Sequence, residues 1–497
     1  MSIPPVSDVS STPGFAEGEE TVSVNPHDTR NVIVGSNQWQ PLTNDNAGNV
    51  SVGPGGFTTC AVWASHDGGR TWSGGAINAA GQTSYVVPPA VAQQPIVRDH
   101  VPSEFDEPGN LISADQNTVW DRHGNVYYEC LFAGTRTADA KVLVFRSGDG
   151  GVTWSRPYEA FSEASTQIQI DRPFIAIDDS GGPRDGTLYL GFETMFYQAY
   201  LPRVYERAST DGGQTWGPIV RVDEDGPNSA QWDPRERPVV GPDGTLHIVY
   251  DAAQFVSVAP IDPEATPIEV MVASSTDGGR TFRQSMVEPN VRRIVSPDEA
   301  EPFFTETIPA IATDPHHAGR LAVAWPDVRE GPARILLRTS SDGGRSWRAP
   351  LDVSDDPVRV ANQHDHVQLT YLPDGRLVVV WRDRRFTGGS FDAPFDVFAR
   401  AFDVDSAGRL TPGRTVRVTS ASQPPTTSHR GNMPSEYLDA AGSSAGVHVA
   451  WDEMAGGLPD NVYRLIPMAA FGPERTAPAK RPAKHHRRKR HSHHRKR

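Results

Sequence analysis

The chain has 497 residues, of which 37% are hydrophobic, and its 45 glycines and 43 prolines predict many short segments joined by tight turns. The formal net charge of −14 gives no sign of nucleic-acid binding, and no run of about 18 apolar residues occurs that could form a membrane-spanning helix. From Thr476 onward there are ten Lys or Arg and no acidic residue, so the rest of the chain carries 37 basic against 61 acidic residues.

Segments in which apolar and polar residues alternate recur from residue 21 to residue 465, as is typical of half-buried β-strands. They form seven groups, each opening with two strand patterns separated by a turn rich in Gly, Asp or Asn. The first group has strand patterns at 21–24, 31–34 and 61–63, and residues 73–112, rich in Pro, Gly and Gln, form an insertion after it. The later groups open near Thr118, Asp171, Arg235, Thr307, His364 and Ser435.

An octapeptide follows the third strand pattern in five of these groups, and at Ser209–Trp216 it reads Ser-Thr-Asp-Gly-Gly-Gln-Thr-Trp. Its aspartate can accept backbone N–H groups of a tight turn, and its two glycines supply positive φ angles. A looser sixth copy occupies Asp403–Gly408. Recurrence of the octapeptide at a similar spacing indicates stacked or radial repeats rather than separate domains. The five aspartates lie 82, 62, 66 and 65 residues apart, at Asp67, Asp149, Asp211, Asp277 and Asp342.

The octapeptides resemble the Asp box, or bacterial neuraminidase repeat, of sialidases and related β-propellers. The resemblance implies an all-β propeller of four-stranded antiparallel blades, with the boxes in the turns between the third and fourth strands. The seven groups predict seven blades, and six, as in sialidases, is the alternative. The last group lacks a clear fourth strand, so we expect the segment around Val6–Val9 to supply it. We expect an N-terminal segment at 1–20, one propeller domain at 21–472 and a disordered basic tail at 473–497.

The two cysteines, Cys60 and Cys130, lie in apolar strand patterns, and we expect them to be buried free thiols. A disulfide joining the first two repeats is the alternative, and it would imply export. Residues 1–20 lack a basic stretch followed by an apolar core, so the chain as written shows no secretion signal. The family resemblance nevertheless suggests an extracellular protein, and the basic tail is a candidate contact with an anionic surface.

Charged residues concentrate at one edge of the predicted blades. In an antiparallel blade the start of the first strand and the end of the second lie on the same face, opposite the octapeptide turns. Acids and arginines occupy these positions in several groups, and the first strand is innermost, so they are expected to crowd the mouth of the central channel. For any one residue, an ion pair that closes the ring is the alternative role.

The resemblance to sialidases implies three arginines that bind the carboxylate of the substrate, because a planar guanidinium matches a carboxylate with two hydrogen bonds. The first arginine of the family lies in an Arg-Ile-Pro motif. Arg172 and Arg237, each followed directly by proline, are the closest matches, while Thr307-Ile308-Pro309 has threonine in place of the arginine. The other candidate arginines are Arg382 and Arg385.

The family also uses a tyrosine nucleophile with a neighbouring glutamate, and an aspartate as general acid/base. Tyr437 beside Glu436 is one candidate pair. Glu236, which precedes a Pro-Asp-Gly turn, resembles the glutamate of the family. The aspartates that could serve as acid/base are Asp327, Asp365 and Asp383.

Two functions remain open from the sequence. The first is a sialidase-like exo-glycosidase that removes terminal acidic sugars from glycans. The second is a non-catalytic propeller that binds a glycan or a protein through the same charged face. No phosphate-binding glycine loop or metal-ligand spacing occurs, so we expect no cofactor, and we expect a monomer. Convergence of three arginines on one point would favour the enzyme, and a separate acid for each arginine would favour the binding protein.

Overall fold

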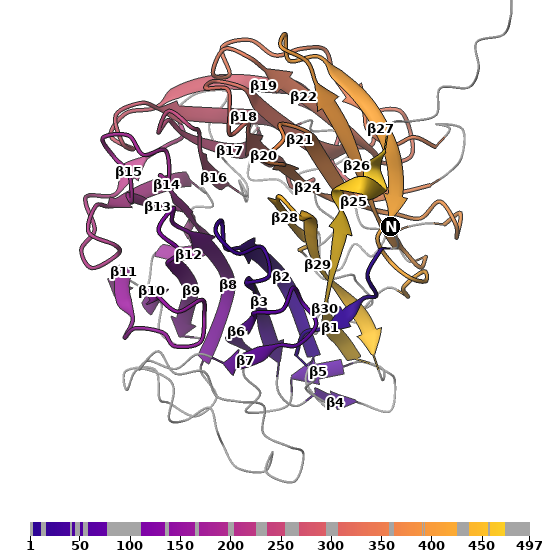
Figure 1. Ribbon diagram of the computed structural model, residues 1–497. Helices are drawn as coiled ribbons and strands as arrows, with labels where there is room; N and C mark the ends of the chain where they lie inside the picture. Colours follow the sequence, from indigo (N-terminus) through magenta and orange to yellow (C-terminus); the bar gives the residue numbers. More distant parts are fainter. Residues whose placement is uncertain are drawn as a thin grey trace, which may run out of the picture.

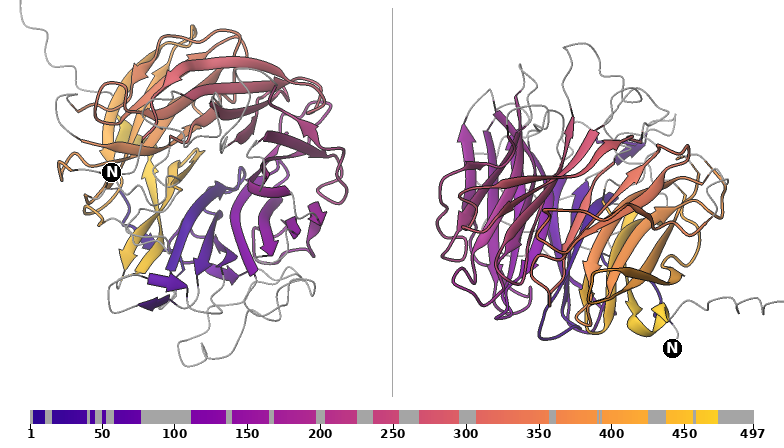
Figure 2. Two further views of the ribbon diagram at one scale, coloured as in Figure 1. Left: turned by 180° about the vertical axis from the view of Figure 1, so that it is seen from behind. Right: turned by 90° about the horizontal axis from the view of Figure 1, so that it is seen from above.

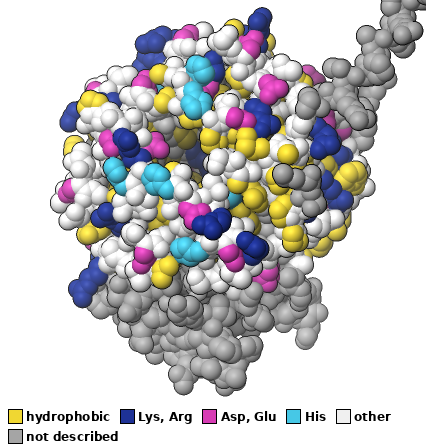
Figure 3. All heavy atoms as spheres, in the orientation of Figure 1, with side chains coloured by type: hydrophobic (Ala, Val, Ile, Leu, Met, Phe, Trp, Pro, Cys, Tyr) yellow, Lys and Arg dark blue, Asp and Glu magenta, His cyan; other side chains and the backbone are white. Residues whose placement is uncertain are grey.

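The computed structural model describes residues 3–10, 16–39, 42–44, 50–52, 58–76, 111–134, 139–164, 168–196, 203–224, 236–253, 268–294, 307–356, 362–389, 391, 393–424, 437–455 and 458–472. These residues form a ring of seven four-stranded antiparallel blades, as predicted, so the six-bladed alternative is excluded. The first strand of each blade faces the centre of the ring (Figure 1). Figure 2 shows the ring on edge, and the face drawn in Figure 3 has a central hollow that is bordered by side chains of mixed type.

In each blade the strands follow one another in chain order from the centre of the ring outward, except that β1 completes the last blade. Blade 1 contains β2 (Ala16–Val24), β3 (Val32–Trp39), β6 (Thr58–Ser65) and β7 (Ser73–Ala76). Blade 2 contains β8 (Leu111–Trp120), β9 (Val126–Gly134), β10 (Asp139–Ser147) and β11 (Tyr158–Ala164). Blade 3 contains β12 (Ile168–Ile177), β13 (Leu188–Phe196), β14 (Arg203–Ser209) and β15 (Val220–Arg221). Blade 4 contains β16 (Arg237–Val240), β17 (Leu246–Ala253), β18 (Ile268–Ser275) and β19 (Arg283–Val291).

The second half of the ring repeats this order. Blade 5 contains β20 (Ala310–Thr313), β21 (Leu321–Asp327), β22 (Arg334–Ser340) and β23 (Leu351–Asp352). Blade 6 contains β24 (His364–Tyr371), β25 (Leu377–Asp383), β26 (Asp396–Val404) and β27 (Leu410–Arg417). Blade 7 contains β28 (Asp439–Ser443), β29 (Gly446–Ala455), β30 (Leu458–Pro467) and β1 (Ser7–Asp8). A small hairpin, β4 (Leu42–Asn44) and β5 (Val50–Val52), and a 3-10 helix, η3 (Met468–Phe471), complete the described elements. Within the described ranges, no helix is long and apolar enough to cross a bilayer.

The ring closes where the two ends of the propeller meet. Strand β1 pairs antiparallel with β30, with Ser7 opposite Tyr463, so the N-terminal segment forms the outermost strand of the last blade. The Ser10 hydroxyl donates to Asp460, and the Trp72 ring of blade 1 packs edge-on against Tyr463. This is the segment from which the sequence predicted the closing strand. This pairing covers the edge that β30 would otherwise expose.

The octapeptide turns join the third and fourth strands in blades 1 to 5. In blade 4 the Ser275 hydroxyl donates to Asp277, which in turn accepts the backbone N–H and the hydroxyl of Thr281. The Gly279 N–H donates to the Ser275 hydroxyl, and both glycines of this turn have φ near +80°. Burial by itself raises the pKa of Asp277, but the hydrogen bonds lower it to about 2. The same bonds recur in the other four turns, which explains the fixed Ser, Asp, Gly and Thr or Ser positions.

The cysteines form a disulfide rather than the free thiols that we expected from the sequence. Cys60 of β6 and Cys130 of β9 are bonded, with their Cα atoms 6.4 Å apart. Both are buried in the apolar layer between blades 1 and 2, where Tyr128, Phe145 and Trp154 pack around them. The expectation was wrong because the two strands are 70 residues apart in sequence and become neighbours only when the blades stack.

Replacing both Cys60 and Cys130 with serine should lower the free energy of unfolding by about 2–4 kcal/mol, because the crosslink restricts the unfolded chain. Denaturant unfolding of the variant and of the oxidised parent protein measures the difference. Equal midpoints in the presence and absence of reductant would contradict a stabilising role for this bond.

Glu206 of β14 is a buried acid at the junction of blades 3 and 4, and among the described residues its Oε1 accepts no hydrogen bond. Burial, and secondly the negative charge of Asp277, raises its pKa to about 9. A carboxyl group with a raised pKa in the folded state stabilises the protein below its unfolded pKa. This contribution is lost as the pH rises toward the folded pKa.

Glu206→Gln should therefore leave stability unchanged near pH 4 and raise the free energy of unfolding by about 1–3 kcal/mol at pH 8. Thermal or urea unfolding across this pH range tests the prediction. A variant that is less stable than the parent at pH 8 would show that the charged form of Glu206 is the stabilising one.

Candidate functional site

Four innermost strands share the same backbone irregularity at the charged face of the ring. In β2, β8, β12 and β24 the pairing with the second strand skips two residues, which is the pattern of a β-bulge. The first bulge residue in each strand has a positive φ, between 44° and 61°, although none is glycine. Such strained residues occur where the surrounding structure fixes the direction of a side chain. They are Glu19, Asp115, Arg172 and His366.

Tyr437, which directly precedes β28, is a meeting point for these innermost strands. Its ring is buried and packs with Phe174 of β12 and with Ile308. The Cζ atoms of Arg172 and Arg237 lie 5.7 Å and 5.8 Å from the centre of the ring. The Tyr437 hydroxyl donates to Oδ1 of Asp115 at 3.3 Å. Blades 2, 3, 4, 5 and 7 thus contribute to one cluster.

Arg237 of blade 4 also approaches a second residue of blade 7, Asp439. Its Nη1 lies 3.8 Å from Oδ1 of Asp439, an ion pair too long to be a hydrogen bond, and its Cζ lies 4.5 Å from the centre of the Phe174 ring. Burial lowers the pKa of Arg237, while Asp439 and Tyr437 oppose that effect. Burial also raises the pKa of Asp439, against the effect of Arg237. The structure therefore brings Arg172, Arg237 and Tyr437 together, and their role as site residues stays a prediction.

Arg382 lies beside this cluster but already has close partners. It is fully buried, and its Nη2 donates to Oδ1 of Asp452 at 2.8 Å and to the carbonyl oxygen of Tyr437 at 3.2 Å. Its guanidinium thus joins β25 to blade 7. Glu436 lies outside the described residues, so its position relative to Tyr437 stays a prediction.

Asp327, Asp383 and Arg385 belong to a motif that recurs in two blades. In blade 5 the Trp325 indole donates to Asp327, which also accepts the backbone N–H of Arg329. In blade 6 the Trp381 indole donates to Asp383, which likewise accepts the backbone N–H of Arg385. The arginine side chains return to the same carboxylates. The repetition indicates that these residues fasten the ends of the second strands.

Asp365 is also strongly ion-paired. Its Oδ2 accepts a hydrogen bond from Arg384 at 2.8 Å, and Nδ1 of His366 lies 3.2 Å from its Oδ1. Burial alone raises the pKa of Asp365, but Arg384 and His366 reverse this and hold it well below the usual range. A general acid must hold a proton near its working pH. The acid/base role of Asp327, Asp365 or Asp383 stays a prediction, and for Asp365 and Asp383 ion pairing favours the charged form.

Two further buried carboxyl groups belong to this region, because they lie near Asp115, the partner of Tyr437. Glu236 and Glu129 are both fully buried, and Glu129 belongs to β9, the second strand of blade 2. Burial, followed by the charges of Asp115 and Glu236, raises the pKa of Glu129 well above its usual value. Asp115 is one of the acids that the sequence places at the start of a first strand, but no role was predicted for it or for Glu129. The signal for Glu129 was an acid within the apolar run Tyr127-Tyr128-Glu129-Cys130.

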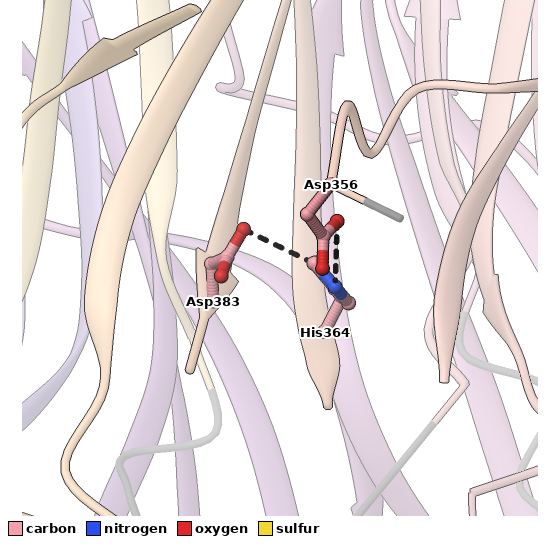
Figure 4. A group of neighbouring side chains, drawn as sticks. All are labelled: Asp356, His364 and Asp383. Carbon is pink, nitrogen blue, oxygen red and sulfur yellow. Dashed lines mark ion pairs between the residues drawn. The ribbon is translucent and has the colours of Figure 1, made fainter. Parts of the chain in front are cut away.

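One group of side chains has the composition of a metal site. Oxygens of Asp356 and Asp383 and a nitrogen of His364 all lie within 4.8 Å of one another, with the two carboxylates on either side of the imidazole (Figure 4). However, Arg334 donates to Asp356 at 2.9 Å and Arg385 to Asp383 at 2.6 Å. With a guanidinium on each carboxylate, the cluster is better satisfied as an ion-pair network than as a cation site.

The network favours a charged His364. Burial by itself lowers the pKa of His364, but Asp356 and Asp383, at 3.3 Å and 3.2 Å, outweigh it and raise the pKa above the ordinary value. A histidine with a raised pKa stabilises the fold below the unfolded pKa near 6.5, and the contribution disappears as the pH rises through the folded pKa.

His364→Gln should therefore lose about 3–5 kcal/mol of unfolding free energy at pH 5.5, because two buried carboxylates lose their shared partner, and lose less at pH 9. Urea unfolding at both pH values measures this. A loss that is larger at pH 9 would show that His364 is neutral in the folded protein.

Comparison with known proteins places the chain in a family. Residues 128–387, more than half of the chain, match the model of the BNR repeat-like domain, so the chain belongs to that family. A sialidase of Micromonospora viridifaciens is 25% identical over 343 residues, which cover 63% of this chain and 43% of the sialidase. The chain thus spans less than half the length of that relative, and it is a sialidase-like propeller.

The solved structures with some similarity to the chain include the following two. A protein of unknown function from Dyadobacter fermentans superposes with a TM-score of 0.47 at 14% identity, over 72% of this chain and 95% of its own. An α-L-arabinanase from Penicillium chrysogenum superposes with a TM-score of 0.46 at 13% identity, over 77% of this chain and 94% of its own.

Proposed function

We propose that the protein is an exo-glycosidase that removes a terminal acidic sugar, such as sialic acid, from a glycan. One observation carries the proposal: the Tyr437 hydroxyl donates to a buried carboxylate, Asp115, while Arg172 and Arg237 approach the same ring. Membership in the BNR repeat-like family and the similarity to a sialidase support it.

The proposed roles follow from the chemistry of these groups. Arg172 and Arg237 would bind the carboxylate of the sugar, because a guanidinium offers paired N–H donors to two oxygens. Tyr437 would attack the anomeric carbon while the glycosidic bond breaks, and Asp115 would accept the phenol proton. The departing glycan oxygen would take a proton from a general acid or from water, and a water molecule would then release the sugar from Tyr437. Glu236 would contribute negative charge near the developing positive charge of the sugar ring.

A second function, a non-catalytic propeller that binds a glycan or a protein, also has support. Arg382, Arg384 and Arg385 pair with Asp452, Asp365 and Asp383, respectively, so each has its own acid. Two candidate arginines, Arg172 and Arg237, approach the Tyr437 ring, whereas Arg382 reaches the carbonyl oxygen of Tyr437 and is paired with Asp452. A binding protein would require no nucleophile.

Location and assembly belong to the same proposal. The Cys60–Cys130 disulfide fits an oxidising compartment, and we propose an extracellular protein that acts on glycoconjugates. We also propose a monomer with a single propeller domain at 21–472, and a basic tail at 473–497 that contacts an anionic surface.

Release of a fluorogenic group from an α-linked sialoside tests the enzyme. Tyr437→Phe and Arg237→Ala should each lower kcat/KM by about 10²–10⁴-fold, because the first removes the nucleophile and the second removes a carboxylate ligand. Glu206→Gln, which is remote from Tyr437, is the control and should keep the activity of the parent. Absence of release by the intact protein, with retained binding on a glycan array, would favour the second function.

A further inference from the structure

Glu129 combines complete burial with a lack of hydrogen bonds. Its relative exposure is 0%, and among the described residues no group donates to either carboxylate oxygen. An isolated carboxylate in such a place is costly, whereas an uncharged carboxylic acid is tolerated far better. Burial without hydrogen bonds therefore favours the uncharged form of Glu129.

At the position in the blade that Glu129 occupies, the two neighbouring blades have glycine. Glu129 pairs with Asn117, the first residue after the bulge of β8. At the same register Gly35 pairs with Thr21 in blade 1, and Gly191 pairs with Phe174 in blade 3. Blades 1 and 3 thus place a residue without a side chain where blade 2 places a carboxyl group.

The surroundings of the two glycines show which way this position faces. A Cβ at Gly35 would lie 2.9 Å from Oγ1 of Thr21 and 3.1 Å from Cγ of Gln116, which belongs to the innermost strand of the next blade. A Cβ at Gly191 would lie 3.5 Å from Cγ of Glu236, again in the next blade. The position faces the innermost strand of the next blade, so the side chain of Glu129 extends toward that strand rather than toward the periphery of the ring.

Three acids share this region, and they differ in their contacts. The charges of Asp115 and Glu236 both act on Glu129 and, after burial, raise its pKa. Asp115 accepts a hydrogen bond from the Tyr437 hydroxyl at 3.3 Å, whereas Glu129 receives none from the described residues. Neighbouring carboxylates in a poorly solvated site do not all ionise together, and the proton stays where the charge is least favoured.

We propose that Glu129 is a positioning residue: a buried, uncharged carboxylic acid that leaves Asp115 as the ionised acceptor for the Tyr437 hydroxyl. This inference rests on the proposed function, because it concerns the tyrosine that we assign as the nucleophile. Loss of the Glu129 proton to solvent at high pH would place a second negative charge beside Asp115. The negative charge that forms on Tyr437 during attack would then be disfavoured, so activity falls on the alkaline side.

Glu129→Gln tests the proposal, since glutamine has the shape of the uncharged acid and cannot ionise. The pH dependence of kcat/KM for the fluorogenic sialoside should extend at least one pH unit further into the alkaline range in this variant. Glu206→Gln, which removes another buried acid away from Tyr437, should leave the profile unchanged. A Glu129→Gln profile that superposes on that of the parent, or activity lost at every pH, would overturn the proposal.

A second measurement does not depend on activity. With Glu129 uncharged in the fold, the unfolding equilibrium constant of the parent should rise about tenfold per pH unit relative to Glu129→Gln, starting above the unfolded pKa near 4.5. In an Asp115→Asn background the ratio of the two constants should stop rising at a lower pH, because removal of the neighbouring negative charge lowers the pKa of Glu129. A ratio of constants that does not change between pH 5 and pH 7 would refute an uncharged Glu129 even if no sialoside is hydrolysed. Failure of hydrolysis with the expected ratio would instead count against the proposed reaction alone.

Discussion

Closure of the ring is the constraint on which the structure depends. The last of the seven blades is completed only by a strand from the start of the chain, and β1 supplies it by pairing with β30. Closure fixes how closely the innermost strands approach, and through them the separation of side chains from distant parts of the sequence. The hydrogen bond between Asp115 and Tyr437, which are 322 residues apart, exists only in the closed ring.

Closure also forces ionisable groups into a poorly solvated centre, and the structure resolves this in two ways. On one side, pairs such as Arg382 with Asp452 and Arg384 with Asp365 neutralise each other and join neighbouring strands. Near Tyr437, in contrast, Glu129 is buried and accepts no hydrogen bond from the described residues, and burial raises its pKa. This uneven distribution of partners separates groups that hold the ring together from groups that are available for chemistry.

The sequence was a good guide to the fold and a partial guide to the site. The Ser-Asp-Gly-Gly-Thr pattern encodes a local turn whose hydrogen bonds lie within five residues of each other, so the blades could be predicted from it. Arg172 and Arg237 were visible because proline follows each of them. The bulges in β8 and β12 left no sequence signature, so the importance of Asp115 was not apparent. The partners of Arg382 and Arg385, like the disulfide, depend on which strands become neighbours in space.

The pairing of β1 with β30 has a consequence for the order of folding. The outermost strand of the last blade is synthesised first and must wait, unpaired, until the residues of β30 emerge several hundred residues later. The Cys60–Cys130 bond, in contrast, needs only the first two repeats. The disulfide can thus form early, and the β1–β30 pairing forms late. A nascent chain that stalls before this pairing would leave the edges of β1 and β30 exposed to association with other strands.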